Sequence, residues 1–412
     1  MCDIFIEKYL NEVNFRFLFR MFLLFFLFVF IFNSSALGDS LPQSVVPLGF
    51  GVATHFRNSP GLSEIKLMKG AGISIARTCL EWSNVEKEKG VFDFDPYLSL
   101  VDQLNAAGIQ PLIILAYGNR LYDQSLPPFH DGINTESSRM AFARYAAAAA
   151  MAFRDKNVLW EIWNEPNLKN YWRPEPSPSE YVDMTILAAN AIKSVDKNAS
   201  VFAISLSGFT KKAFSYLEGC LKLNILDFVD GISIHPYRRK NPETVLTDYD
   251  KLNSLLVKYN QSKKDIKVIC SEWGYSSNVE VDIQSQGDYA VRMYLLNLSS
   301  GIPVTIWYDW RDDGYNLNNR QDNFGLFTKQ DGPKPSYFTL KKMNSELNGF
   351  RLVRRQQSTN SDDWVLLFEN ETQKKLVFWT TGAPHQIKVS LTPNGPVFQL
   401  KLSSSPQYQA FP

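Results

Sequence analysis

The sequence predicts an α/β protein whose main part is a closed (β/α)8 TIM barrel, followed by a small C-terminal antiparallel β domain. Apolar strand-like runs alternate with helical periods eight times over about 300 residues, as in a parallel sheet that closes on itself. After Gly349 the helical periods stop, and short strand-like runs follow one another. We therefore divide the chain into a signal segment at 1–38, a barrel at 39–348 and a small β-sheet domain at 349–412.

The strands are predicted from short apolar runs and the helices from the residues that start and stop them. One helix begins at Asp95 and Pro96, and another at Ser177 and Pro178, where Ser177 can cap the backbone and proline fits the first turn. The predicted barrel strands are 46–54, 73–79, 111–117, 158–163, 201–206, 228–235, 266–272 and 303–308. The predicted helices are 61–69, 95–108, 138–153, one from 177, 211–220, 245–259, 284–298 and one from 335 to about 349. The predicted C-terminal strands are 351–354, 364–368, 375–380, 385–391 and 397–402, with a turn at Asn394-Gly395.

The N-terminal segment has the pattern of a secretory signal peptide. Residues 21–32 are all apolar, Arg16 and Arg20 precede them, and the small residues Ala36 and Gly38 follow. This pattern predicts cleavage before Asp39 and a secreted or periplasmic protein. Twelve apolar residues are few for a bilayer span, so a retained membrane anchor is the alternative.

Composition excludes several function classes. The net charge of +1 gives no electrostatic reason to expect nucleic acid or an anionic membrane as a partner. Behind the signal segment remain Cys79, Cys220 and Cys270, an odd number that is no disulfide framework, and we expect Cys79 and Cys270 to be small buried residues on strands. Neither Cys-x-x-Cys nor His-Glu-x-x-His occurs, so we predict no metal and no cofactor. The aromatic content of 14% fits either core packing or platforms for sugar rings.

Two apolar runs end in a glutamate at the expected edge of the barrel. Glu165 stands in Trp-Asn-Glu-Pro at 163–166, and Glu272 stands in Ser-Glu-Trp-Gly at 271–274. Pro166 ends the first strand because proline cannot continue a ladder. Barrel enzymes keep their chemistry at this edge, which makes the two glutamates candidate catalytic residues. The alternative is that both are structural carboxylates.

These paired motifs, with Ile-Ser-Ile-His-Pro-Tyr at 232–237 between them, resemble the retaining glycoside hydrolases of clan A. The resemblance is strongest to glycoside hydrolase family 39, with family 5 as the second choice, and it spans roughly residues 46–347. It implies an O-glycosyl hydrolase that acts on a carbohydrate by double displacement, with Glu165 as acid/base and Glu272 as nucleophile. It also implies that Asn164 contacts the sugar 2-hydroxyl, that Tyr237 lies near Glu272 and that His235 lines the subsite.

Further site residues follow from the resemblance or from strand ends. Arg77 matches the arginine of the second strand, and in an apolar context it needs a carboxylate partner, either Glu161 or Glu272. A positive charge beside Glu272 would keep that group ionised. The resemblance makes Trp307 the platform under the reacting sugar. The residues expected to line the cleft because they lie at strand ends are His55, Tyr117, Asn119 and Trp310, each with core packing as the alternative.

The sequence leaves several questions open. A transglycosylase would use the same two glutamates, and an inactive carbohydrate-binding barrel is a third possibility. The substrate could be a xyloside, a glucan, a uronic-acid glycan or an exopolysaccharide, and exo or endo action depends on the loops at 121–134 and 309–323. We expect a monomer. We also expect the two carboxyl groups to lie about 5–5.5 Å apart, as in retaining enzymes, and not roughly 6.5–9.5 Å apart, as in inverting ones.

Overall fold

The computed structural model describes residues 41, 44–56, 61–124, 133–330, 332–391 and 396–411. The predicted signal segment and the turn at Asn394-Gly395 lie outside the described residues. The described chain from Leu41 onward forms one compact unit. None of its helices combines the length and the apolar character that crossing a membrane requires.

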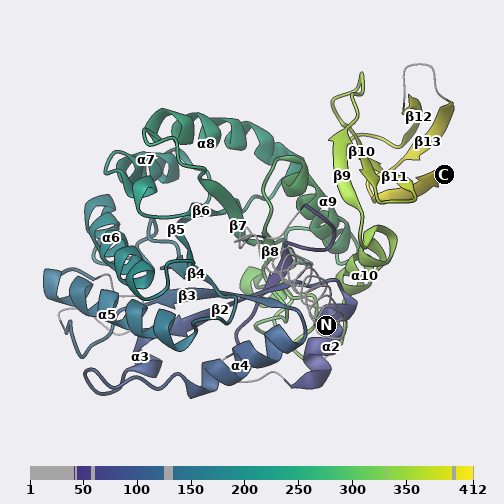
Figure 1. Cartoon of the computed structure of the whole chain (residues 1–412). Helices are drawn as coiled ribbons and strands as arrows, with labels where there is room; N and C mark the ends of the chain where they lie inside the picture. The colour runs from purple at the N-terminus through teal and green to yellow at the C-terminus, as the bar shows by residue number, and fades with distance from the viewer. Residues whose placement is uncertain are drawn as a thin grey trace, which may run out of the picture. The chain divides into compact units, whose positions relative to one another are not determined.

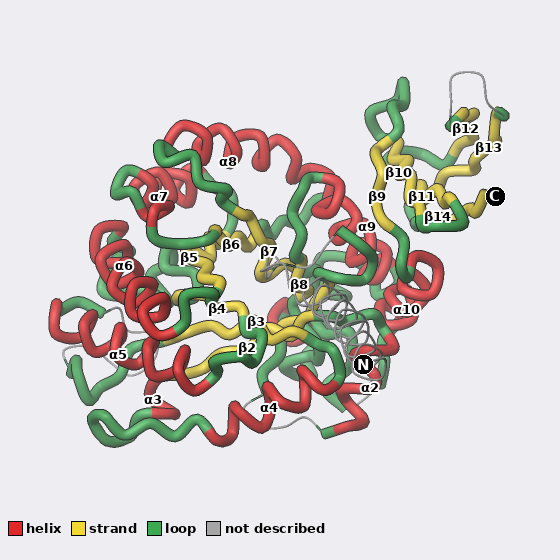
Figure 2. The backbone as a smooth tube through the Cα atoms, viewed as in Figure 1, coloured by secondary structure: helices red, strands yellow, loops and turns green. Residues whose placement is uncertain are grey.

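Eight parallel strands close into a barrel, which confirms the predicted fold (Figures 1 and 2). Each strand pairs with the next, and β8 pairs with β1 through Gly51 opposite Ile306. A side chain at Gly51 would meet the side chain of Ile306 at 2.5 Å, so this position requires glycine for close packing. The barrel strands are β1 (Phe50–Ala53), β2 (Ile75–Glu81), β3 (Gln110–Ala116), β4 (Leu159–Ile162), β5 (Ser200–Ser207), β6 (Gly231–His235), β7 (Lys267–Trp273) and β8 (Thr305–Trp307).

Helices surround the strands in an outer ring, as Figure 2 shows. They include α2 (Leu62–Gly70), α3 (Trp82–Val85), α4 (Asp95–Ala106), α5 (Glu136–Ala152), α6 (Pro178–Val195), α7 (Lys211–Leu221), α8 (Leu246–Tyr259), α9 (Ser285–Ser299) and α10 (Pro335–Leu347). Short 3-10 turns lie at η1 (Ile225–Asp227), η2 (Pro242–Val245) and η3 (Arg320–Asn323). Ser177 caps α6 as predicted, because its hydroxyl accepts the backbone N–H of Glu180. Thr135 caps α5 in the same way.

The buried side chains form two main layers that follow strand alternation. Side chains that point into the barrel, such as Ile75, Leu112 and Ile306, form an inner cluster. Side chains that point outward pack under the helices in a much larger cluster. The alternation therefore decides whether a residue at a strand end can reach the mouth of the barrel.

The C-terminal residues form a four-stranded sheet and a separate two-stranded hairpin. The sheet has the order β14 (Gln407–Phe411), β11 (Lys374–Thr380), β10 (Asp363–Glu369) and β9 (Arg351–Arg355). The hairpin pairs β12 (His385–Ser390) with β13 (Val397–Leu402). The sequence reasoning found five of these strands and missed β14.

A buried ion pair joins the C-terminal sheet to the barrel. Arg292 on α9 makes a two-pronged contact with Glu243, at 2.8 and 2.6 Å, and the indole of Trp379 on β11 donates to the same carboxylate at 2.8 Å. Lys375 adds a contact to Glu346 on α10 at 3.1 Å. Charge-assisted hydrogen bonds of this kind fix orientation as well as adding energy, so the sheet is anchored on α9, η2 and α10.

Candidate active site

The backbone after β4 places Glu165 at the mouth of the barrel. Regular strand geometry ends at Ile162, and both Trp163 (φ 68°) and Glu165 (φ 47°) adopt left-handed conformations. Trp163 consequently turns outward and packs against Trp172 under the helices. Side chains two residues apart share a face in a regular strand, which would place Trp163 beside Glu165, but the left-handed turn separates the two. Left-handed backbone at a non-glycine residue is costly and clusters at functional sites, which supports a functional role for this turn.

Glu272 on β7 lies opposite, and both of its carboxylate oxygens are held. Arg77 donates to one oxygen at 2.7 Å, and the hydroxyl of Tyr237 donates to the other at 2.8 Å. Burial alone would raise the pKa of Glu272, but the charges of His235 and Arg77 and the bond from Tyr237 lower it below its usual value. Burial and the charge of Glu272 raise the pKa of Tyr237 well above its usual value, so its hydroxyl stays protonated and can donate.

Arg77 connects three strands beneath the site. Its guanidinium donates to Glu161 on β4 at 2.8 Å, to Glu272 on β7 at 2.7 Å and to the side-chain oxygen of Asn164 at 2.8 Å. Burial would lower the pKa of Arg77, but the two carboxylates raise it, and the side chain stays charged. Arg77 thus pairs with both candidate partners. Because the oxygen of Asn164 is occupied, its amide N–H groups are left for a ligand hydroxyl.

His235 lies behind Glu165 and not in the cavity wall. One ring nitrogen lies 3.0 Å from a carboxylate oxygen of Glu165, and the other lies 3.0 Å from the hydroxyl of Ser271. The His235 side chain is completely buried. The prediction that His235 lines the subsite is therefore wrong, because the sixth strand ends at this residue with its ring turned toward β4 and β7. From this position it holds Glu165 in place.

A cavity of about 530 Å³ opens above these residues. Glu165 and Glu272 both line it, together with Asn164, Tyr237, Tyr117 and His55 from the sequence predictions. The sequence reasoning did not find Tyr171, Tyr308, Arg320, Gln321 and Cys79, which also line it. Cys79 was expected to be buried, but its side chain reaches the cavity and is partly exposed.

Tyr117 lies in the cavity wall, whereas Asn119 does not. The Tyr117 ring packs edge-on against Trp163 and stacks on Tyr171, with centroids 5.4 and 6.1 Å away. Asn119 is buried and donates to the backbone carbonyl of Glu86 at 2.8 Å. Asn119 therefore organises the loop after β3, and its prediction as a cleft residue is wrong.

Trp307 is not a sugar platform and Trp310 does not line the cavity, which corrects both predictions. Trp307 is completely buried in the helix-side cluster, and its indole donates to the carbonyl of Phe324 at 3.1 Å. Trp310 packs against Phe327 and donates to Glu64 on α2. The reason is strand alternation on β8. Ile306 points into the barrel, so Trp307 must point out, and Tyr308 is the residue that reaches the cavity.

His55 borders the cavity beside two aspartates of the loop after β8. Its ring nitrogen lies 3.4 Å from Asp309 and 3.4 Å from Asp313, and Asp313 also accepts the hydroxyl of Tyr308 at 3.0 Å. The contact with Asp309 raises the pKa of His55. Asp309 is 1% exposed, its contact with His55 is long at 3.4 Å, and burial raises its pKa to about 7.

Two trios of described residues bring metal-ligand atoms within 4.8 Å of one another. The first contains Glu165, His235 and Glu272, but Arg77 and Tyr237 already occupy the oxygens of Glu272, which makes that trio a poor cation site. The second contains His55, Asp309 and Asp313.

Replacing Asp309 by asparagine should change how stability depends on pH. The folded protein holds the Asp309 proton more tightly than the unfolded chain, so this contribution to stability is complete below about pH 4 and is lost as the pH rises through 7. When the pH rises from about 5 to 8.5, we expect the free energy of unfolding of Asp309→Asn to increase relative to that of the wild type. The shift from 3.8 to about 7 sets an upper limit of about 4 kcal/mol. Urea unfolding at the two pH values measures the difference.

The exposed Asp250 on α8 provides the matched control, since Asp250→Asn removes a carboxylate that faces solvent. A stability difference between Asp309→Asn and the wild type that is equal at both pH values would contradict a raised pKa at Asp309.

A double substitution should separate the two roles of Arg77. In Arg77→Met the fully buried carboxylate of Glu161 loses its partner, and we expect a loss of about 3–5 kcal/mol in the free energy of unfolding. Arg77→Met with Glu161→Gln should recover most of the stability, because the orphaned charge is gone. Activity should stay low in both, since Glu272 lacks its cation. Recovery of activity in the double variant would show that Arg77 acts only through Glu161.

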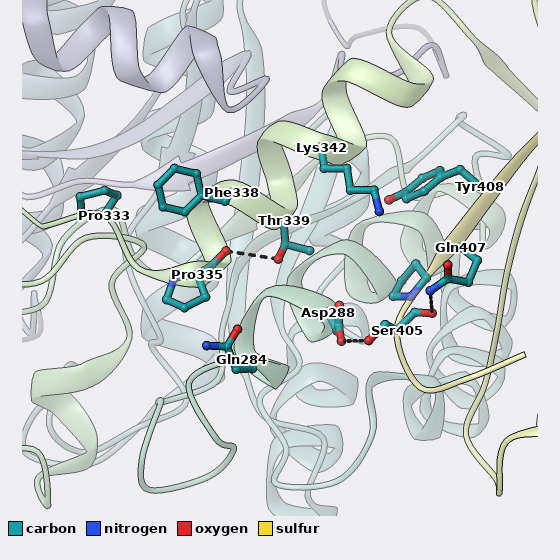
Figure 3. Close-up of a pocket in the computed structure, with 11 residues that line it drawn as sticks. Gln284, Asp288, Pro333, Pro335, Phe338, Thr339, Lys342, Ser405, Gln407 and Tyr408 are labelled. Carbon is teal, nitrogen blue, oxygen red and sulfur yellow. Dashed lines mark hydrogen bonds between the residues drawn. The ribbon is translucent and has the colours of Figure 1, made fainter.

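A second cavity, of about 560 Å³, lies between α9, α10 and the segment before β14 (Figure 3). Figure 3 shows Phe338 and Thr339 from α10 on one side and Tyr408 with Ser405 on another, and Asp288 bonds to Ser405. None of the predicted site residues lies there. The paired glutamates and the shifted pKa values of the groups around them identify the first cavity as the candidate active site. Cavity size does not distinguish the two cavities.

A closed (β/α)8 barrel with glutamates after β4 and at the end of β7, and an arginine between them, has the pair of carboxyl groups that cleavage of a glycosidic bond requires. The family model "Glycosyl hydrolases family 39" matches residues 143–273, a segment that contains both glutamates. A curated β-xylosidase from Geobacillus stearothermophilus is 33% identical over 92 residues, which cover 22% of this chain and only 18% of that enzyme.

Solved structures agree with this match. A family 39 glycoside hydrolase from Bacteroides cellulosilyticus WH2 shares 26% identity with a TM-score of 0.75, over 89% of this chain and 82% of that one. A monomeric β-xylosidase from Caulobacter crescentus CB15 shares 16% identity with a TM-score of 0.64, over 85% of this chain and 80% of that one, which shows the common fold. These comparisons relate the chain to glycoside hydrolase family 39, through the matched segment 143–273 and through the fold.

Proposed function

We propose that this protein hydrolyses O-glycosidic bonds of a carbohydrate with retention of the anomeric configuration. The observation that carries the proposal is the placement of the two glutamates. A carboxylate oxygen of Glu165 and one of Glu272 lie within 4.8 Å of each other across the cavity. This supports the short separation of retaining enzymes, about 5–5.5 Å, because inverting enzymes need roughly 6.5–9.5 Å to hold an attacking water beside the sugar.

In the first step the ionised Glu272 attacks the anomeric carbon, and the bond from that carbon to the leaving oxygen breaks. Glu165 donates a proton to the leaving oxygen. In the second step Glu165 takes a proton from water, whose oxygen attacks the anomeric carbon and releases Glu272 as a carboxylate. Arg77 and Tyr237 hold Glu272 in the charged form that begins the cycle, and His235 positions Glu165.

NMR of the first-formed product tests the proposal directly. The intact protein is incubated with a panel of aryl β-glycosides, and spectra are recorded before mutarotation mixes the anomers. A β-anomer as the first product is the expected result. A product that first appears as the α-anomer would refute double displacement, even if both glutamates prove essential.

We also propose that the protein is exported and acts as a monomer. The apolar run at 21–32, with Arg16 and Arg20 before it, supports export. Sequencing of the exported form should begin near Asp39, and recovery of the full-length chain from the cytosol would end this idea. The Caulobacter crescentus relative is described as monomeric, which supports the second point, and light scattering tests it.

A further inference from the structure

We propose that the second cavity, between α9, α10 and the segment before β14, binds a sugar unit of a glycan chain outside the active site. The cavity has a volume of about 560 Å³, which is in the usual range for a ligand site. Three parts of the chain line it, with Gln284 and Asp288 at the start of α9, Phe338 and Lys342 on α10, and Tyr408 on β14 (Figure 3). The inference goes beyond the cleavage reaction, although it takes its class of ligand from the proposed function.

Contacts between the three parts fix the walls of this cavity. α9 and α10 approach each other at Gly287, where an added side chain would lie 2.8 Å from the Cα atom of Ser336. The hydroxyl of Ser336 donates to the side chain of Gln286 on α9 at 3.1 Å. The segment before β14 is held to α9 because the hydroxyl of Ser405 donates to Asp288. The cavity is therefore already formed without a ligand, which lowers the cost of ordering its walls on binding.

Rings form the apolar part of the lining. Phe338 is 55% exposed, and its ring lies at the edge of the cavity near Pro333 and Pro335. The ring of Tyr408 lies across the cavity, and the side-chain nitrogen of Lys342 is 5.7 Å from its centroid. A sugar ring has an apolar C–H face that packs on aromatic rings, and such rings offer a large rigid contact area.

The polar part of the lining fits the hydroxyl groups around a sugar ring. A hydroxyl both donates and accepts, and the side-chain amide of Gln284 can do the same. Asp288 accepts from Ser405 through one carboxylate oxygen, and Figure 3 shows the other oxygen on the side of Lys342. A purely apolar ligand would cover these groups without giving them partners, which is costly. A small anion would lie against Asp288 and leave the rings uncovered, so the lining fits a sugar better than either.

The position of the second cavity relates it to the active site. Gln284 and Pro335 stand where α9 and α10 begin, and these helices follow β7 and β8. In a (β/α)8 barrel the helices begin on the side where the strands end, which is the side of the catalytic glutamates. One end of the second cavity therefore lies on the same side of the barrel as the active site. A glycan chain held there stays at high local concentration near the active site.

Native gel electrophoresis in gels that contain soluble xylan or soluble mixed-linkage β-glucan tests the binding with the intact protein. We expect at least one of these polysaccharides to retard the wild type. Phe338→Ala removes the exposed ring and should weaken the apparent affinity about tenfold, and Gln284→Ala should weaken it severalfold. Met140→Ala is the matched control, because Met140 is an apolar side chain of α5 that is 49% exposed, and it should behave as the wild type. A wild type that neither polysaccharide retards would overturn the inference, as would equal retardation of the wild type, Phe338→Ala and Gln284→Ala.

Kinetics with a small substrate separate this site from the active site. A 4-nitrophenyl β-xyloside is too short to need a second binding site, so its kcat/KM should stay within about twofold of the wild type in Phe338→Ala. A tenfold loss on this substrate would overturn the inference, because Phe338 would then act on the active site. If the wild type cleaves no aryl glycoside, the proposed hydrolysis fails, and the retardation of the wild type and its variants still decides whether the second cavity binds a glycan.

Discussion

Glu272→Gln should reduce turnover by at least about 10⁴-fold, because an amide cannot form the covalent bond to the anomeric carbon. Glutamine has nearly the same shape and can still accept hydrogen bonds from Arg77 or Tyr237. The fold should therefore persist, and circular dichroism and the urea midpoint should change little. The measurement is kcat for the aryl glycoside that the wild type cleaves fastest.

Glu371→Gln, in the exposed hairpin between β10 and β11, serves as the control for removal of a carboxylate, and its activity should equal that of the wild type. Residual activity of Glu272→Gln above about one per cent, with the same anomer formed, would assign the nucleophile to another residue. Added azide should not restore a product of retained configuration in this variant, since the first displacement is lost.

Glu165→Ala should lower kcat/KM in a way that depends on the leaving group. Glycosides with alkyl or sugar leaving groups need the proton and should lose about 10³-fold. A dinitrophenyl glycoside leaves without protonation, so its first step should stay within about tenfold of the wild type. Its second step should be slow, because no base activates the water. Azide needs no base, and it should accelerate this step and yield a glycosyl azide with the starting configuration.

His235→Gln provides a comparison for this result, because its ring contacts Glu165 and not the cavity. It should weaken activity evenly for good and poor leaving groups, to a smaller extent than Glu165→Ala. An equal loss on all substrates in Glu165→Ala, without rescue by azide, would mean that Glu165 does not supply the proton.

The barrel and the two glutamates could be predicted because their signals are local. Alternating periods define the strands and helices, and each glutamate stands in a short motif at the end of an apolar run. Arg77 could also be predicted, since a buried arginine on a strand must find a carboxylate. The sequence left open which one, and the structure shows both Glu161 and Glu272.

The walls of the cavity could not be predicted in the same way. β8 is only three residues long, and its register with β7 shifts between Cys270 and Trp273. A prediction that assigns the wrong face of this strand to the cavity names Trp307 in place of Tyr308. The alternation from Ile306 would have pointed to Tyr308. Arg320 and Asp309 come from an irregular loop whose path depends on tertiary contacts, such as Asp309 to His55, that no local pattern encodes.

The position of Arg77 also bears on the lifetime of the covalent intermediate. While the sugar is bound to Glu272, that carboxyl group carries no charge, and Arg77 keeps only Glu161 as a charged partner. The guanidinium then stabilises the negative charge that develops on Glu272 as its bond to the sugar breaks. Tyr237 adds a second donor to the same carboxyl group. Both make Glu272 a better leaving group in the second step. The same contacts that prepare the attack thus destabilise its product, and the glycosyl-enzyme should break down readily once water reaches it.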